Sequence, residues 1–369
     1  LENDFVTFSG AATLGGVITA NVLNQEYQVT HVVSATVFQI EARAVATISE
    51  ITTTSGLNPT FVFANTSDSG NGGGSSVGAY QINTGLDTSV QGTGWGAGTW
   101  GRGTWDSASD LTAGGNTLRI WSHDNFGEDL LMNVRDEGIF YWDKTNGVTT
   151  RAVSLASLGV AADNIPTIAK QVLVSDKDRH IIAFGCDPET AIGTQDPLLI
   201  RFGSQESLTD WSAKATNTAG DLRIGSGSEI ITAVETRQQV LVFTDVSLHA
   251  MQFLGPPFTF GINLISENIT IASPKAAVAV DDVVFWMGSA EFYAFTGAVQ
   301  RIPCTVRDYV FDDINTSQSD KIVSGANVSF SEVWWFYPSA DSTENDRYVV
   351  YNYLEKLWFI GNLARTAWL

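Results

Sequence analysis

The sequence predicts an all-β protein with a β-propeller-type core, a small N-terminal β-module and one short helix. Five runs of apolar and aromatic residues, each ending at a glycine, a proline or a polar turn, recur at intervals of 51, 59, 43 and 50 residues. Each run is apolar at consecutive positions, so both faces of the strand must be covered. A repeat of about fifty residues is typical of propeller blades, in which four short strands pack between two neighbouring sheets. The runs are Asp129–Asn133, Ile181–Gly185, Val240–Thr244, Val283–Gly288 and Val333–Pro338.

The composition also favours strands. Hydrophobic residues make up 44% of the 369 residues and charged residues only 16%, with 34 glycines and 11 tryptophans. The chain is rich in Thr, Val, Ser and aromatic residues, whereas long helices need Ala, Leu, Glu and Lys. No stretch approaches the ~20 apolar residues of a membrane span. Cys186 and Cys304 lie far apart, and neither they nor the four histidines show metal-ligand spacing, so we expect no disulfide framework, no metal and no cofactor.

The net charge of the chain argues against tight binding of nucleic acid. Forty acidic residues stand against 20 basic residues, which gives a net charge of −20. Residues 1–118 contain no lysine and only Arg43 and Arg102 as cations, against nine carboxylates. A protein that binds a phosphate backbone shows the opposite sign. The acidity also keeps an aromatic-rich protein soluble, which is the simpler interpretation.

Residues 1–63 are predicted to form the β-module. Asp4–Phe8 is the first expected strand, and Tyr27–Thr30 and Phe38–Glu41 alternate between apolar and polar residues, as strands with one buried face do. Strand-like residues begin almost at Leu1 and still continue at the other end. We therefore expect the module to be truncated at its start and the core to be incomplete at the C-terminus.

Residues 64–117 have the composition of a linker and an interface loop. Ser69–Ser76 consists of glycine, serine and asparagine, which is typical of a flexible linker. Further along, Trp95, Trp100 and Trp105 recur every fifth residue among glycines. Tryptophans at this density could stack on sugars. They could also fill a neighbouring protein surface while the glycines provide turns, which is the interpretation we favour.

Residues 118–369 carry the repeated unit of the predicted propeller-like core. Leu118–Ser122, Leu130–Asn133 and Gly138–Trp142 predict three consecutive strands, and the loop that follows contains the turn signal Asn146-Gly147. After Pro303, apolar residues at positions i, i+3, i+4 and i+8 predict a short amphipathic helix over Val306–Ile314.

The sequence gives little support for catalysis, and we expect no enzyme. A glycosidase needs two carboxylates that converge on one bond. The pairs Glu128-Asp129, Asp281-Asp282 and Asp312-Asp313 are adjacent in sequence, and adjacent strand residues point to opposite faces. Thr66–Gly70 resembles the start of a sialidase aspartate box but lacks its tryptophan. The glycine-rich stretch has no lysine before its serines, so it is no phosphate loop, and no G-x-S-x-G elbow occurs.

Several segments together resemble one family. They are Trp121–Leu131, Gly138–Asp143, Leu199–Glu206 with Asp210-Trp211, Val240–Asp245 with Phe253–Phe258, and Phe285–Gly288 with Phe292–Gly297 and Ile302-Pro303. Each segment alone is unspecific, but their order on one chain resembles the tail nozzle, or tail tubular protein B, of short-tailed bacteriophages of the podovirus type. This family is related to packaged-DNA stabilisation proteins. The resemblance covers about residues 118–369 and carries no catalytic motif.

The resemblance implies a structural subunit of the virion at the distal end of the tail. Such subunits assemble as a homo-hexameric ring that continues the tube formed by the tail adaptor, or tail tube protein A, and that contacts the tail fibres. The ring retains double-stranded DNA, lets it pass at ejection without sequence-specific binding, and meets the host surface at the tail tip. An acidic conduit fits this role, because every contact of Lys or Arg with phosphate would slow the passage of DNA.

Other functions remain open on the sequence alone. A carbohydrate-binding or depolymerising β-propeller at the phage or cell surface would use Trp95, Trp100 and Trp105 as sugar platforms. A secreted or cell-surface adhesion propeller would use the N-terminal module as its binding head. A basic track for DNA would require Arg119, Arg135, Arg201 and Arg237 to converge across the blades.

Overall fold

The protein divides into two compact units. The computed structural model describes residues 5–34, 36–42, 62–81, 118–148, 150–175, 177–255 and 258–368. The smaller unit comprises Leu1–Leu86 and Gly92–Thr117, and the larger unit comprises Asp87–Gln91 and Leu118–Leu369. The larger unit contains all five repeated runs.

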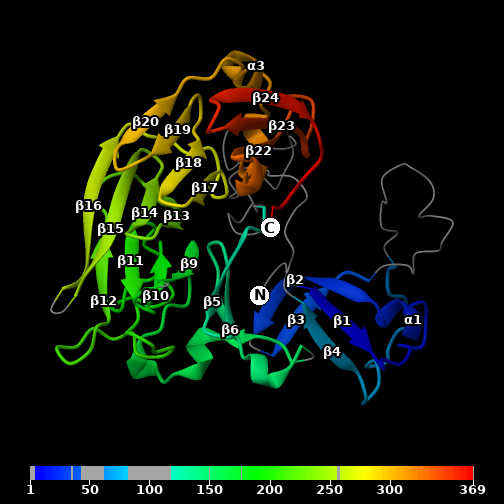
Figure 1. Cartoon of the computed structure of the whole chain (residues 1–369). Coiled ribbons are helices and arrows are strands. Elements are labelled where there is room, and N and C mark those ends of the chain that lie inside the picture. The colour runs from blue at the N-terminus through cyan, green and yellow to red at the C-terminus, as the bar shows by residue number, and fades with distance from the viewer. Residues whose placement is uncertain are drawn as a thin grey trace, which may run out of the picture. The chain divides into compact units, whose positions relative to one another are not determined.

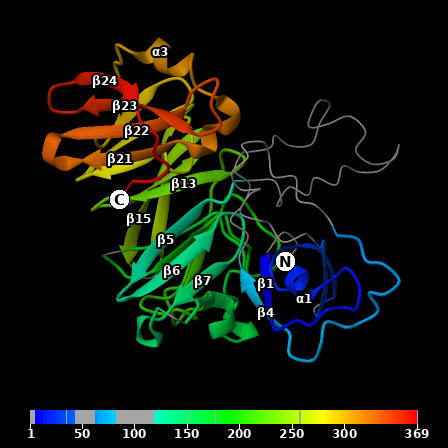
Figure 2. The same cartoon turned by 90° about the vertical axis from the view of Figure 1, so that its right-hand side faces the viewer.

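The larger unit consists of five four-stranded antiparallel sheets. In every sheet, neighbouring strands are also consecutive along the chain, so each sheet is a simple meander. Figure 1 shows the sheets following one another from β5–β8 through β13–β16 to β21–β24, and Figure 2 shows β5, β6 and β7 side by side. The strands are β5 (Trp121–Phe126), β6 (Asp129–Val134), β7 (Ile139–Trp142), β8 (Val153–Ser154), β9 (Gln171–Val174), β10 (Ile181–Phe184), β11 (Leu199–Phe202), β12 (Gly220–Arg223), β13 (Ile230–Glu235), β14 (Val240–Thr244), β15 (Ser247–Gly255), β16 (Thr259–Glu267), β17 (Ala277–Val280), β18 (Val283–Met287), β19 (Phe292–Phe295), β20 (Val299–Ile302), β21 (Val323–Asn327), β22 (Glu332–Pro338), β23 (Asn345–Asn352) and β24 (Leu357–Asn362).

The predicted fold class is confirmed, because these sheets are propeller-type blades. The five apolar runs correspond to β6, β10, β14, β18 and β22, which are the second strands of the five sheets. The first strand begins later than the sequence suggested, at Trp121 rather than Leu118.

Four hydrophobic clusters lie between successive sheets, and β10, β14 and β18, the second strands of the three middle sheets, each contribute to two of them. In β18, Val284 and Trp286 pack toward the β13–β16 sheet, whereas Phe285 and Met287 pack toward the β21–β24 sheet. The same division separates Ile181 and Ala183 from Ile182 and Phe184 in β10. Consecutive strand residues point to opposite faces, so an uninterrupted apolar run supplies side chains to both neighbouring interfaces. We call each apolar interface between two successive sheets a seam. Each buried side chain of this size stabilises the fold by about 1.5–3 kcal/mol.

The two terminal sheets differ from the three between them. On β6, Leu130 and Met132 are only partly buried and belong to none of the four clusters, so the expected burial of both faces holds for only one face of this strand. On the β21–β24 sheet, Trp334 and Phe336 stack with the ring of Trp368, each at a centroid distance of 6.0 Å. A side chain at Gly325 would collide with that indole, so glycine is required there.

The predicted short helix is present as α3 (Arg307–Phe311), between β20 and β21. Val310 is buried, as the apolar pattern indicated. Tyr309 is not part of the core: it is 49% exposed, and its hydroxyl accepts a hydrogen bond from Arg347 Nη1 at 2.6 Å. The five 3₁₀-helices in the described chain are η1 (Lys144–Asn146), η2 (Leu155–Leu158), η3 (Ala161–Asp163), η4 (Thr316–Lys321) and η5 (Val328–Phe330).

The smaller unit contains one four-stranded sheet in the order β3-β2-β1-β4. The first three strands lie near the predicted positions, whereas β4 comes from the stretch 64–117 and pairs with β1. The sequence did not predict the helix α1, whose four residues are too few to show an amphipathic period. Its N-cap is Thr19, which accepts from Val22 N. The elements are β1 (Phe5–Ser9), α1 (Ala20–Leu23), β2 (Glu26–Ser34), β3 (Val37–Ile40) and β4 (Val77–Gln81).

We expect a charge within a seam to destabilise the fold strongly. Trp335 and Val284 are fully buried, so Trp335→Asp or Val284→Asp should destabilise the protein by about 4 kcal/mol or more. The neighbouring Val283 is only partly buried at the start of β18, although it belongs to an apolar run. Val283→Asp should therefore destabilise the protein far less than Val284→Asp. Urea denaturation of the soluble fraction checks this order. Equal losses at positions 283 and 284 would contradict the assignment of faces.

Candidate functional site

The first strands of the sheets line an open cavity of about 220 Å³. Its walls come from β5, from the start of β9, from β13 and from the segment just before β17, so four sheets contribute to it. We call it the axial cavity. Its lining includes Trp121, His123, Arg135, Lys170, Gln171 and Lys275.

Side chains that line the axial cavity provide hydrogen-bond partners for backbone groups at the free edges of the first strands. Each first strand has a neighbour in its own sheet on one side only, so its other edge needs hydrogen-bond partners. Ser122 Oγ accepts from Val172 N at 3.2 Å, and Asp124 Oδ2 accepts from Val174 N at 2.8 Å. These bonds join β5 to β9.

Gln171 makes the corresponding connection between β9 and β13. Its amide nitrogen donates to the carbonyl of Ala233 at 2.8 Å, and its amide oxygen accepts from Ala233 N at 2.8 Å. Thr232 Oγ1 also donates to that oxygen at 2.9 Å. One side chain thus reproduces both hydrogen bonds of a strand pair. Between β17 and β21, Lys275 forms an isolated parallel bridge with Val323.

A group of charged residues beside the cavity, the axial cluster, joins three sheets. The ammonium of Lys170, in a side chain only 7% exposed, lies 2.9 Å from Asp136 Oδ1 and 2.7 Å from Glu229 Oε2. Asp136 follows β6 and Glu229 precedes β13. Burial opposes the ionisation of Asp136, but the charge and hydrogen bond of Lys170, the hydrogen bond of Gln195 and the charge of Arg135 together outweigh burial and lower the pKa of this carboxyl.

Arg135 completes the axial cluster. Its guanidinium donates to the carbonyls of Ile231 at 2.7 Å and Ile230 at 3.4 Å. Burial raises the pKa of Asp320, with a contribution from the nearby Glu229 and opposition from Arg135. Positive and negative groups are therefore intermixed around the cavity. This arrangement fixes sheets to one another and leaves no concentrated positive charge there.

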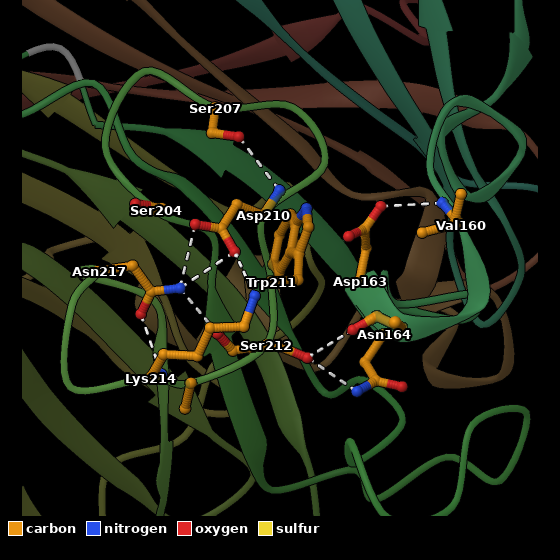
Figure 3. A network of polar contacts seen from close by, with 12 residues as sticks. Val160, Asp163, Asn164, Ser204, Ser207, Asp210, Trp211, Ser212, Lys214 and Asn217 are labelled. Carbon is orange, nitrogen blue, oxygen red and sulfur yellow. Dashed lines mark hydrogen bonds and ion pairs between the residues drawn. The ribbon is translucent and has the colours of Figure 1, made fainter.

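A second polar network holds the loops around Trp211 (Figure 3). The indole is buried against Gly203, and its nitrogen donates to the carbonyl of Leu208 at 2.9 Å. Both carboxylate oxygens of Asp210 accept from Asn217 Nδ2 at 3.0 Å, and Ser212 Oγ accepts from Asn164 Nδ2 at 2.8 Å. The family-like segment Asp210-Trp211 is thus part of the framework.

Arg201 is buried in the same region. It donates to the carbonyls of Asn164 at 2.6 Å and Asp187 at 3.1 Å. Burial raises the pKa of the adjacent Cys186 thiol to about 12, so this cysteine stays protonated at neutral pH. A protonated, buried thiol is not available as a nucleophile.

Each of the four arginines that could have formed a basic track has an ion-pair or hydrogen-bond partner within the chain. Arg119 pairs with Glu137 and Arg237 with Asp281, while Arg135 and Arg201 bind backbone carbonyls. At least ten of the 18 basic residues after position 117 form ion pairs within the chain. Convergence of these arginines into one basic face is therefore not observed.

The adjacent carboxylate pairs occupy turns and element ends. Asp281 has a positive φ of 54° in the turn between β17 and β18. Asp129 accepts from Tyr141 Oη at 2.6 Å, and this bond is the main cause of its lowered pKa. Asp313 forms an ion pair with Arg347 at 3.0 Å. In each pair at least one member has a structural partner.

The predicted interface residues Trp95, Trp100 and Trp105 lie outside the described residues. Within the described part of the chain, no three His, Cys, Asp or Glu side chains are grouped so that they could hold a metal ion. No helix among the described residues has the length and apolar character to cross a bilayer. The sequence did not reveal the axial cluster, because Asp136, Lys170 and Glu229 come from three distant segments with no shared motif.

Two solved structures show a weak structural similarity to this chain. No family profile matches the chain, and no curated protein matches it. Hsv2 of Kluyvelomyces marxianus has a TM-score of 0.35 and 6% identity, with 65% of this chain and 62% of Hsv2 covered. The extracellular domain of the one-component system BT4673 from B. thetaiotaomicron has a TM-score of 0.37 and 13% identity, with 63% and 27% covered. This chain thus spans less than two thirds of either protein, and neither protein's role is transferred to it.

We expect Gln171→Ala to weaken the junction between β9 and β13. The substitution removes three hydrogen bonds and leaves the backbone of Ala233 without its partners, which should cost about 1–3 kcal/mol. Gln205→Ala is the matched control, because Gln205 is exposed on a turn. Chemical denaturation of both variants checks the difference. A Gln171→Ala protein as stable as the control would contradict the role of this side chain.

Proposed function

We propose that this protein is a structural subunit of the tail nozzle ring of a short-tailed bacteriophage, where it forms part of the distal DNA conduit. The observation that carries the proposal is that the family-like segments form the framework of consecutive blades. Trp121–Leu131 forms β5 and part of β6, Val240–Asp245 covers β14, and Phe285–Gly288 covers most of β18. The resemblance thus concerns residues that build the scaffold, as expected for a structural protein.

The charge distribution supports a conduit that does not bind DNA. After position 117 the chain has 31 acidic and 18 basic residues, and most of these basic residues already have partners within the chain. Tight binding to duplex DNA needs several cations aligned along successive phosphates. With its cations engaged, the described surface offers mostly carboxylates to a passing polymer.

The alternative of a carbohydrate-binding propeller has one supporting observation. Trp121 lines the axial cavity together with Asp124 and His123, and an indole beside polar groups is a common sugar-binding arrangement. The cavity, at about 220 Å³, is smaller than most ligand pockets. Calorimetric titration with host surface glycans distinguishes the two functions, because a conduit subunit should show no binding that depends on Trp121.

Electron microscopy and light scattering of the purified chain test the proposed assembly. We expect rings with a central hole and a mass six times that of the 39.8 kDa chain. A monomer at all accessible concentrations would refute the ring.

The proposed conduit also predicts weak DNA binding that low salt does not rescue. Between about 50 and 200 mM salt, a protein with six to ten phosphate contacts loses about 10³–10⁵ in affinity, whereas we expect less than about a tenfold change here. Fluorescence anisotropy with a labelled duplex measures this dependence. Tight binding with a steep salt dependence would instead indicate a DNA clamp.

A further inference from the structure

The hairpin of β15 and β16 differs from the rest of the chain in its charge. Its two strands have nine residues each, Ser247–Gly255 and Thr259–Glu267. Between Asp245 and Glu267, 21 consecutive residues include no Asp, Glu, Lys or Arg. His249 is buried in this stretch, and burial lowers its pKa, which favours the neutral form. A long hairpin without charges is unusual in a protein with a net charge of −20.

The end of the hairpin next to its turn packs against the neighbouring sheet. Phe253 and Phe260 lie 5.5 Å apart between ring centroids, and the His180 ring contacts them at 5.8 Å and 5.2 Å respectively. His180 belongs to the turn between β9 and β10 and is fully buried. Phe260 also packs on Phe202 at 4.9 Å. These contacts hold the hairpin in a fixed direction.

The end of the hairpin exposes large apolar side chains. Phe258 is 74% exposed, Leu254 is 59% exposed and Phe253 is 37% exposed. Phe258 N donates to the carbonyl of Gly255 at 3.2 Å. We call Phe253, Leu254 and Phe258 the hairpin tip. The contact with His180 holds Phe253 in place, so this side chain loses little conformational entropy on binding, which favours association.

We propose that the hairpin tip binds a second copy of this chain and forms a subunit contact of the ring; this inference rests on the proposed function. Two copies that each carry a charge of −20 repel each other, so they must meet where carboxylates are absent. The hairpin provides such a surface, with aromatic and aliphatic side chains that lose contact with water on binding. The tip inserts into a different surface of the neighbouring copy, and such a heterologous contact forms a ring when the rotation from copy to copy closes.

The test compares two double variants of the 369-residue chain by sedimentation velocity and light scattering over a range of concentrations. Leu254→Ser with Phe258→Ser removes the hairpin tip. Phe330→Ser with Leu354→Ser is the matched control, since these residues are 68% and 75% exposed on other turns. All four side chains are largely exposed, so both variants should keep the wild-type circular dichroism spectrum and melting temperature. We expect the first variant to need at least about tenfold higher concentration to assemble, and the control to assemble like the wild type.

The outcomes separate this inference from the proposed function. If the wild type and both variants assemble equally, the hairpin tip is not the subunit contact, while the ring itself stands. If both variants lose assembly, the effect is not specific to the hairpin and the inference fails. If the wild type stays monomeric, the ring and the contact both fail. Flotation of a monomeric wild type with phosphatidylcholine vesicles, lost in the Leu254→Ser, Phe258→Ser variant, would assign the tip to a lipid surface instead.

Discussion

Burial of both faces of the second strands in the three middle sheets is the constraint on which the larger unit depends. A four-stranded meander cannot cover its own faces, so the side chains of β10, β14 and β18 are buried only when sheets lie on both sides. Every seam therefore includes residues from strands that also support the next seam. The sheets should consequently gain stability together, because the loss of one exposes apolar surface on its neighbours.

The polar contacts around the axial cavity provide partners for backbone groups that the packing of the sheets leaves unpaired. Sheets that pack face to face bring their first strands together with unsatisfied backbone groups at the edges. Gln171 and Asp124 supply the missing hydrogen bonds from their side chains, and Lys170 neutralises carboxylates from two other sheets. These contacts are directional, whereas apolar burial is not, so they specify how each sheet is positioned against the next.

The ion pairs within the chain also bear on the proposed role as a DNA conduit. Cations that hold sheets together, such as Lys170 and Arg119, are not available to bind phosphates. In the proposed conduit the excess carboxylates would repel DNA, but they would also oppose the association of copies. A subunit of this kind needs uncharged contact surfaces, and the β15–β16 hairpin has that property.

The sequence by itself determined the fold class, the five repeated strands and the short helix after Pro303. These features depend on local alternation and spacing, which are visible along the chain. Only the tertiary structure decided which faces are covered: Val283 and Leu130 belong to apolar runs, yet both are only partly buried. The axial cluster also depended on the tertiary structure, because Asp136, Lys170 and Glu229 meet only after three sheets have packed. Isolated charged residues far apart in sequence carry no periodicity, so their pairing cannot be inferred before the fold is known.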